Sequence, residues 1–422
     1  MQGDQLETAR PRPTQAVILA GGRGTRLHPL TDTRPKPMVE INGKPFLAYQ
    51  IEQIRNQGFE KILLLLGYLP EVIQNYCGDG SRWGVKIEYS VSAADDETAQ
   101  RIRLAESRLD PYFLLLYCDN YWPMQIEKMW SRFFANKAPA MITVYTNKDG
   151  YTRNNVRVDP DGYVAVYDKT GASPGLQGVE ISYALIDRSV VDLLPEANVS
   201  VEEALYTRLA QQRRLLAYVT DHRYYSAGAL HRLPLTEAFF TRIPTVILDR
   251  DGVLNRRPPR AEYVRTWDEF LWLPGAKEAL RLLKDKGYRV VVVSNQAGIG
   301  RGVMTESELA EINRRMLEEA EQAGGKIETV YYCPHDWSTG CECRKPKPGM
   351  LFQAQKEFHL DLTRSLFIGD DERDQQAAEA AGCQFAMVKN EDSLLNIIQR
   401  TVNQYEQSSR QENSTTRSCN RT

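Results

Sequence analysis

Short apolar runs alternate with amphipathic stretches along the first half of the chain. Residues 46–56 have the spacing of an amphipathic helix, and Gly58 ends it. The apolar runs, which predict buried strands, lie at residues 16–20, 61–66, 86–90, 113–117 and 140–145. Strands that alternate with helices predict an α/β fold with a mostly parallel sheet.

The same alternation begins again in the second half of the chain. Strands are predicted at 245–248, 289–294 and 365–368, and helices at 274–286 and 305–323. The second helix opens with a capping box, Thr and Glu three residues apart, and stops at a pair of glycines. The fold class is therefore α/β, with two doubly wound, mostly parallel (Rossmann-like) sheets in tandem.

The predicted boundaries follow shifts in composition. We expect a flexible N-terminus over 1–14 and a disordered tail over 401–422, which is rich in Ser, Thr, Asn, Gln and Arg. The first domain would cover 15–238 and the second 243–400.

Composition indicates an ordinary globular protein. The chain has 422 residues, 26% of them charged and 42% hydrophobic, with a formal net charge of −2. This balance excludes a disordered chain and gives no electrostatic reason to bind nucleic acid or an anionic membrane. The apolar runs are too short to cross a bilayer, and the first residues lack the apolar core of a secretory signal. We therefore expect a cytoplasmic protein; the oligomeric state stays open.

A glycine-rich loop follows the first predicted strand. Gly21, Gly22 and Gly24, called the glycine loop below, let backbone N–H groups approach an anion. No Gly-Lys-Ser/Thr follows, which excludes a P-loop. Leu27 stands where a dinucleotide-binding fingerprint needs its third glycine. The remaining readings are a different anion-binding loop or a plain tight turn.

Two further residues favour the anion-binding reading. Lys36 lies between Pro35 and Pro37, which we expect to hold it in extended backbone as a placed phosphate contact. Asp119 follows the strand predicted at 113–117, where α/β sheets bind their ligands.

These motifs together resemble the sugar-phosphate nucleotidyltransferases. The resemblance covers about 15–233 and rests on the segments 19–27, 29–31 and 35–38. It implies that the glycine loop cradles a nucleoside triphosphate and that Arg26 and Lys36 neutralise phosphate charge. It also implies that Asp119 holds Mg²⁺ and that Lys169 lies near the phosphate of the sugar.

Two departures from that family leave the activity of the first domain open. The family's second glycine-rich loop is replaced by Asp96–Gln100, and Ser226 stands where the family has a second metal-binding Asp. Serine is a much weaker Mg²⁺ ligand than a carboxylate. The domain either catalyses nucleotidyl transfer in a divergent way or only binds a nucleotide or a partner.

Polar side chains follow each predicted strand of the second domain. Asp249 and Asp251 come directly after the first strand, where one carboxylate can attack phosphorus and the other can transfer a proton. Ser294 and Asn295 follow the second strand and suit a phosphoryl oxygen. Further basic and acidic residues come later, at Arg344, Lys345, Asp370 and Asp371.

This ordered set resembles the haloacid dehalogenase superfamily of phosphohydrolases, over about 245–398. The resemblance implies that Asp249 is the nucleophile, that Asp251 is the acid and base, and that Ser294 and Lys345 bind the phosphoryl group. Mg²⁺ would be held by Asp249, the Asp251 carbonyl and Asp370. No cap domain fits between the first two motifs, so we expect an open site.

Loops would then select the substrate at that open site. The segment 254–273 and the loop 296–302 are the candidates, with Arg301 and Arg344 as substrate-binding residues.

Three of the seven cysteines crowd into a short segment with a histidine. Cys333, His335, Cys341 and Cys343 form a Cys₃His set, which is typical of a closed structural zinc site. Such a zinc would pin the loop that carries Arg344 and Lys345. With this segment the resemblance narrows to the D-glycero-D-manno-heptose 1,7-bisphosphate 7-phosphatases, with the histidinol-phosphate phosphatases as the alternative.

The two resemblances predict a two-step enzyme. The second domain would produce a sugar 1-phosphate, and the first would couple it to a nucleoside triphosphate to give a GDP-heptose type of product. The alternative is a phosphatase whose first domain only binds. The expected partners are sugar phosphates and a nucleoside triphosphate, and the expected cofactors are Mg²⁺ and Zn²⁺.

Overall fold

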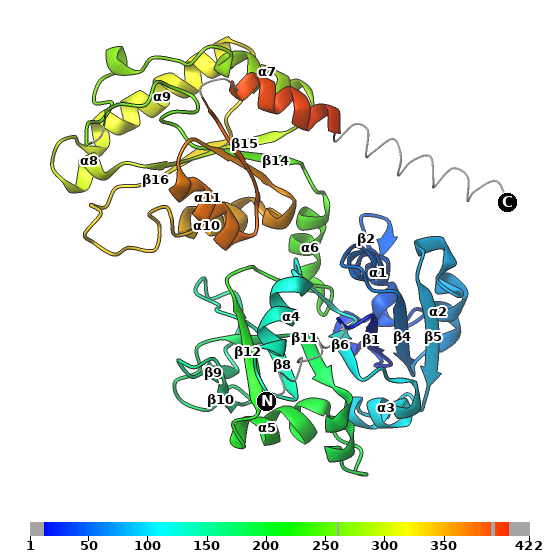
Figure 1. Ribbon diagram of the computed structural model, residues 1–422. Helices are drawn as coiled ribbons and strands as arrows, with labels where there is room; N and C mark the ends of the chain where they lie inside the picture. The colour runs from blue at the N-terminus through cyan, green and yellow to red at the C-terminus, as the bar shows by residue number, and fades with distance from the viewer. Residues whose placement is uncertain (1–11, 260, 390–392, 405–422) are drawn as a thin grey trace, which may run out of the picture. The chain divides into compact units, whose positions relative to one another are not determined.

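The computed structural model describes residues 12–259, 261–389 and 393–404, and the chain divides after Phe240 into two compact units (Figure 1). Residues 394–404 form a helix. The disordered tail predicted over 401–422 is therefore wrong for its first four residues, and the rest of it lies outside the described residues. Most of the flexible segment predicted over 1–14 lies outside them as well.

The first unit is built on a seven-stranded sheet in the order β12-β8-β11-β6-β1-β4-β5. Its strands are β1 (Gln15–Ala20), β4 (Lys61–Leu66), β5 (Lys86–Val91), β6 (Tyr112–Tyr117), β8 (Ala140–Tyr145), β11 (Val179–Asp187) and β12 (Leu215–Thr220). β11 runs antiparallel to β6 and β8, and the other neighbouring pairs are parallel. The predicted mostly parallel α/β sheet is thus confirmed, with one antiparallel strand.

Helices cover both faces of this sheet (Figure 1). α1 (Phe46–Asn56), α2 (Pro70–Cys77) and α4 (Ile126–Phe134) pack on the face that includes Ile18. α3 (Thr98–Leu104), η6 (Glu202–Thr207) and α5 (Arg208–Gln211) pack on the face that includes Val17. Because consecutive residues of β1 face opposite layers and both layers are covered, the strand is apolar at nearly every position.

Short strands and one further helix complete the first unit. The short strands are β2 (Glu40–Ile41), β3 (Lys44–Pro45), β7 (Asn120–Tyr121), β9 (Val156–Val158), β10 (Val164–Tyr167) and β13 (Tyr225–Ser226). β13 pairs with β7, which brings Ser226 opposite Asn120. α6 (Leu233–Phe240) packs on that pair, where Phe239 stacks on Tyr225 with 3.9 Å between ring centroids.

The second unit has a five-stranded, fully parallel sheet in the order β16-β15-β14-β17-β18. Its strands are β14 (Thr245–Leu248), β15 (Arg289–Asn295), β16 (Thr329–Cys333), β17 (Leu366–Gly369) and β18 (Gln384–Met387). α7 (Ala276–Asp285), α9 (Glu306–Gln322) and helix 394–404 cover one face, and α10 (Gly349–Phe358) and α11 (Glu372–Ala381) cover the other. α8 (Ala297–Gly300) is a single turn after β15.

The topology of this sheet indicates where a ligand would bind. β14 lies between β15 and β17, so the chain order changes direction at β14 and the carboxyl ends of these three strands open onto one crevice.

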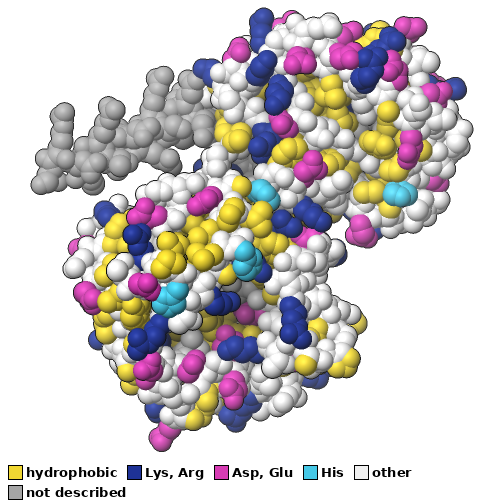
Figure 2. Space-filling model, turned by 180° about the vertical axis from the view of Figure 1, so that it is seen from behind, with side chains coloured by type: hydrophobic (Ala, Val, Ile, Leu, Met, Phe, Trp, Pro, Cys, Tyr) yellow, Lys and Arg dark blue, Asp and Glu magenta, His cyan; other side chains and the backbone are white. Residues whose placement is uncertain are grey.

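The capping box predicted at Thr305 is present and starts α9. On the face drawn in Figure 2, basic and acidic side chains are interspersed over both units. Within the described residues, no helix combines the length and apolar character needed to cross a bilayer.

Candidate functional site

A cavity of about 770 Å³ opens at the carboxyl ends of β14, β15 and β17. It brings together most of the residues predicted for the second domain: Asp249, Asp251, Ser294, Asn295, Arg344, Lys345 and Asp370. Arg301 is the exception, since it does not line the cavity. It lies over Trp337 and donates to the hydroxyl of Tyr263, and both of these aromatic residues do line it.

A buried ammonium group, that of Lys345, lines this cavity. The Lys345 Nζ is 2.8 Å from an oxygen of Asp249 and 2.6 Å from an oxygen of Asp374, and it donates to the Val293 carbonyl at 3.1 Å. The sequence analysis missed Asp374. Its other oxygen accepts the backbone N–H groups of Asp370 and Asp371, each at 3.2 Å. Both Asp374 oxygens are thus used within the protein.

Asp249, Asp370 and Asp374 each offer a carboxylate oxygen within 4.8 Å of the others. Burial raises the pKa of Asp249 to about 7, although the Lys345 ammonium opposes this. Burial likewise raises the pKa of Asp370 to about 6, although Arg257 opposes it. Buried carboxylates that resist ionisation next to one another fit a divalent cation, which would stabilise their charged forms. Asp249 and Asp370 are the carboxylates with oxygens free for it.

The Asp251 carboxylate is surrounded by donors. The Arg250 guanidinium, which is 1% exposed, lies 3.0–3.2 Å from both of its oxygens. The Asn255 and Gln296 side-chain amides each donate to it at 2.9 Å. Burial opposes charge on Asp251, yet these donors, Arg250 foremost, lower its pKa below the ordinary value.

Ser294 and Asn295 differ in what they face. Ser294 is 2% exposed, and its Oγ accepts a hydrogen bond from Gln296 at 2.8 Å. The Asn295 side chain exchanges two hydrogen bonds with the backbone of Lys345, at 3.0 and 3.1 Å. Asn295 therefore holds the Lys345 segment against β15, and its predicted contact with a phosphoryl oxygen stays a prediction.

Three arginines line the cavity that contains these carboxylates. Arg257 donates to Asp370 at 3.1 Å and to Asp371 at 2.6 Å, and it lines the cavity with Arg344 and Arg373. From the sequence, Arg257 was predicted only as part of the segment 254–273, which would select the substrate. Several guanidinium groups on one rim suit a substrate with more than one anionic group.

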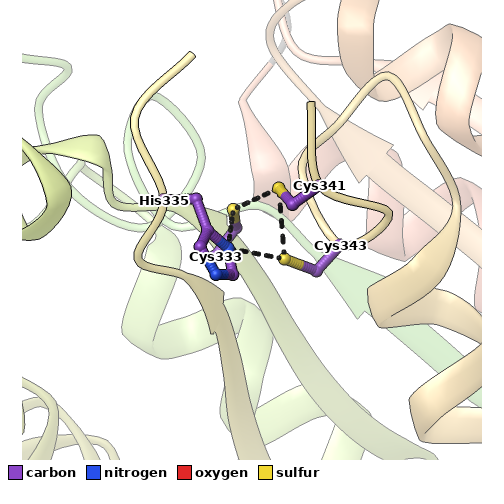
Figure 3. Close-up of side chains that lie close together, drawn as sticks. All are labelled: Cys333, His335, Cys341 and Cys343. Atoms are coloured by element: carbon purple, nitrogen blue, oxygen red, sulfur yellow. Dashed lines mark hydrogen bonds between the residues drawn. The ribbon is translucent and has the colours of Figure 1, made fainter. Parts of the chain in front are cut away.

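The predicted Cys₃His set converges in space (Figure 3). The Cys333 Sγ is 3.6 Å from both the His335 Nδ1 and the Cys341 Sγ, and the Cys343 Sγ is 3.2 Å from the same nitrogen and 3.5 Å from the Cys341 Sγ. Ligand atoms about 2.0–2.3 Å from a tetrahedral zinc lie roughly 3.3–3.8 Å from one another. The four side chains can therefore hold one metal ion, and Arg344 and Lys345 follow directly in the chain.

Three of the residues predicted for an anion site in the first unit lie near one another. Lys36 forms an ion pair with Asp119, and Arg26 lies 4.0 Å from the same carboxylate. Gly24 has φ +68°, and its carbonyl accepts from the Thr31 hydroxyl at 3.0 Å. Lys36 begins a short 3₁₀ turn, η2 (Lys36–Met38), so the predicted extended backbone is wrong there. Proline is compatible with the first turn of a helix because that turn does not use its N–H.

Other predicted residues of the first unit lie further from this pair. The Ser226 hydroxyl donates to the backbone carbonyl of Asp119 at 3.0 Å rather than lying free beside its carboxylate. The Lys169 side chain is 62% exposed and 3.7 Å from a Glu202 oxygen. Gly22 is exposed and Gly21 is buried.

An arginine that the sequence analysis missed lies beneath the glycine loop. Arg101 is 3% exposed, and its guanidinium donates to the carbonyls of Gly21, Leu66 and Ala93, among others. A Cβ on Gly21 would lie 2.2 Å from its Cζ, so a side chain there would have to displace the guanidinium. Arg101 directly follows the segment Asp96–Gln100 in the sequence. The divergence of that segment from the family was the one sign in the sequence that this part of the site differs.

Comparison with known proteins finds a family model and a similar solved structure for each of the two units. A nucleotidyl transferase family model matches residues 15–159, and a HAD-hydrolase-like model matches 342–400. A solved D,D-heptose 1.7-bisphosphate phosphatase from B. bronchiseptica, complexed with magnesium and phosphate, is 30% identical, with TM-score 0.36 over 38% of this chain and 99% of that one. HddC from Yersinia pseudotuberculosis, complexed with GMP-PN, is 23% identical, with TM-score 0.44 over 54% of this chain and 99% of that one.

The particular family follows from a curated relative. The D-glycero-beta-D-manno-heptose-1,7-bisphosphate 7-phosphatase of Pseudomonas aeruginosa is 41% identical over 144 residues, which make up 34% of this chain and 80% of the relative. Through its second unit the chain belongs to this phosphatase family, and residues 15–159 in front of it match the nucleotidyl transferase model. The chain is thus a phosphoric monoester hydrolase.

The tight approach of Gly252 to Asp370 gives a testable prediction. Gly252 has φ +97°, and a Cβ there would lie 1.8 Å from the Asp370 Oδ2. Gly252→Ala must therefore displace a carboxylate at the centre of the cavity, and we expect phosphatase kcat to fall by about 10²-fold. Gly287→Ala is the matched control, since Gly287 has φ +74° but nothing within 4 Å of its added Cβ. Equal activity of the two variants would contradict the prediction.

Proposed function

We propose that the second unit removes the 7-phosphate of D-glycero-D-manno-heptose 1,7-bisphosphate. The observation that carries the proposal is the buried contact of Lys345 with Asp249, beside Asp370 and Asp251, in a cavity rimmed by arginines. The name of the curated relatives supports the choice of sugar. The arginine-rich rim fits a second phosphate on the substrate.

The reaction would proceed in two displacements. Asp249 attacks the phosphorus, the bond from phosphorus to the sugar oxygen breaks, and Asp251 supplies the proton that this oxygen needs. Water, deprotonated by Asp251, then attacks the aspartyl-phosphate, which releases inorganic phosphate and restores Asp249. Lys345 and Ser294 stabilise charge on the transferring group.

Asp249 and Asp370, with the Asp251 carbonyl, would hold Mg²⁺ in this site. When bound, such a cation offsets the repulsion between the carboxylates and the phosphate group. The raised pKa values of Asp249 and Asp370 support this assignment, because without a cation both groups resist ionisation.

A panel of phosphate esters tests the proposal directly. We expect phosphate release from the heptose 1,7-bisphosphate to exceed release from histidinol phosphate and from sugar monophosphates. Asp249→Asn should lower kcat by about 10³-fold or more, because it removes the nucleophile and keeps its size. Histidinol phosphate as the best substrate would overturn the choice of sugar. An Asp249→Asn variant that keeps more than a trace of activity would overturn the nucleophile.

We also propose that the Cys₃His set holds one structural zinc ion. All four ligands would come from the protein, so the ion would have no open position for substrate. Cys341→Ser should lower the zinc content per chain and reduce activity by loosening the segment with Arg344 and Lys345. Cys383→Ser is the control, because that thiol lies outside the set. Elemental analysis that finds no zinc in chelator-free wild-type protein would contradict the assignment.

A second candidate function is nucleotidyl transfer by the first unit, from a nucleoside triphosphate to the sugar 1-phosphate. The assembled Lys36, Arg26 and Asp119 favour it, as does the nucleotidyl transferase model. The product would be of the GDP-heptose type. Ser226, in place of a second metal-binding carboxylate, favours a slow transferase or a domain that only binds.

Replacing Ser226 by Asp, the residue that the family has at this position, tests whether the missing carboxylate slows nucleotidyl transfer. We expect wild-type protein to bind a purine nucleoside triphosphate with Mg²⁺ and to transfer slowly, and Ser226→Asp to raise the transfer rate by about 10²-fold. Lys36→Met should abolish nucleotide binding in both backgrounds. Isothermal titration and a pyrophosphate-release assay supply the readouts. Fast wild-type transfer that Ser226→Asp does not improve would show that another residue replaces the carboxylate.

A further inference from the structure

The side-chain amide of Gln296 lies buried between two residues of the proposed phosphatase site. Its Nε2 is 2.8 Å from the Ser294 Oγ and 2.9 Å from the Asp251 Oδ2. The residue is 1% exposed. Its backbone N–H donates to the Cys333 carbonyl at 2.8 Å, which holds it at the end of β15. Gln296 therefore has little freedom to move away from either contact.

The orientation of this amide follows from its neighbours. The Gln296 Nε2 faces the Asp251 Oδ2, and the ionised carboxylate, the form in which Asp251 deprotonates water, can only accept this hydrogen bond. The second hydrogen on that nitrogen then points to the Ser294 Oγ. The Gln296 Oε1 is buried without a hydrogen-bond partner among the described residues, so it does not compete for either contact. The reverse orientation would place two negative oxygens against each other.

The donated hydrogen bond decides the role that the Ser294 hydroxyl can take. A hydroxyl has one hydrogen to donate and two lone pairs that accept. Because Ser294 accepts from Gln296, its own hydrogen is available to a group in the cavity, which Ser294 lines together with Asp249. A phosphoryl oxygen attacked by Asp249 is such a group. The hydrogen bond from the Gln296 amide thus leaves the Ser294 hydroxyl free to donate its hydrogen to the transferring phosphate.

The same amide fixes the Asp251 carboxylate. Arg250 and Asn255 hold Asp251 from the β14 side of the cavity, and Gln296 is the donor from the β15 side. The contact of Gln296 with Ser294 then ties the carboxylate to the hydroxyl. One small side chain connects the group that binds the phosphate to the group that moves the proton of the leaving alcohol.

We propose that Gln296 is a positioning residue of the phosphatase: it directs the Ser294 hydroxyl hydrogen toward the transferring phosphoryl group and holds the Asp251 carboxylate toward the leaving oxygen. This inference rests on the phosphatase function proposed above. It adds a required side chain that acts through its hydrogen bonds to Ser294 and Asp251.

Two variants and one control separate positioning from packing. Gln296→Met keeps the length of the side chain and removes both hydrogen bonds. Gln296→Glu keeps the shape but sets an acceptor against Asp251 and Ser294. Gln355→Met is the matched control, since Gln355 is also 1% exposed in the same unit but donates to the Leu360 carbonyl, outside the cavity. For each protein, kcat and KM are measured with the heptose 1,7-bisphosphate and with p-nitrophenyl phosphate.

The two esters report on different groups. The sugar alcohol needs a proton from Asp251 to leave, whereas p-nitrophenolate leaves without one. We expect both Gln296 variants to lose about 10²-fold in kcat with the sugar ester and roughly tenfold with the aryl ester, with little change in KM. The remaining aryl loss reports the misdirected Ser294, so Ser294→Ala in the Gln296→Met background should add little to it. Gln355→Met should keep wild-type kcat with both esters.

Several outcomes would overturn the inference. Equal losses with the two esters, or losses matched by Gln355→Met, would indicate packing alone. A Gln296→Glu variant with wild-type kcat would show that no donor is needed at this position; this variant also decides the matter if Gln296→Met does not fold. Wild-type protein inactive on both esters would overturn the phosphatase function itself, and with it this inference. Active wild-type protein with unaffected Gln296 variants would overturn the inference alone.

Discussion

The second unit depends on one buried ion cluster, in which the Lys345 ammonium contacts the carboxylates of Asp249 and Asp374. An unpaired ammonium at 4% exposure would cost several kcal/mol, so the strand end, the basic segment and the start of α11 must meet around it. With Asp370 included, the cluster holds more negative than positive charge. Such an imbalance favours a bound cation between Asp249 and Asp370.

The neighbouring features fit this constraint. Gly252 has no side chain where Asp370 approaches, and Asn295 binds the Lys345 backbone to β15. The Cys₃His set stands immediately before Arg344 in the chain, so a metal ion there would stiffen the segment that delivers Lys345. The first unit has a comparable pair in Lys36 and Asp119, but its Ser226 supplies no carboxylate.

Local pattern predicted eight strands of the two main sheets but not β11, β12, β16 or β18. Strand β4 and helix α1 have the predicted bounds, because burial on one or both faces leaves a periodicity that is read directly. Strand β11 was not predicted at all, and its antiparallel direction is set by how the chain connects distant strands. Asp374 was missed because an Asp early in a helix also serves as a capping residue, which it does here too.

A rapid-quench trapping experiment on wild-type protein with the heptose bisphosphate and Mg²⁺ tests whether Asp249 forms an aspartyl-phosphate. Acid-quenched protein is digested and the peptide that contains Asp249 is analysed by mass spectrometry. The account predicts a phosphoryl group on Asp249 within the first turnover, absent from Asp249→Asn. Phosphate release at full rate with no phosphorylated Asp249 peptide at any quench time would contradict it.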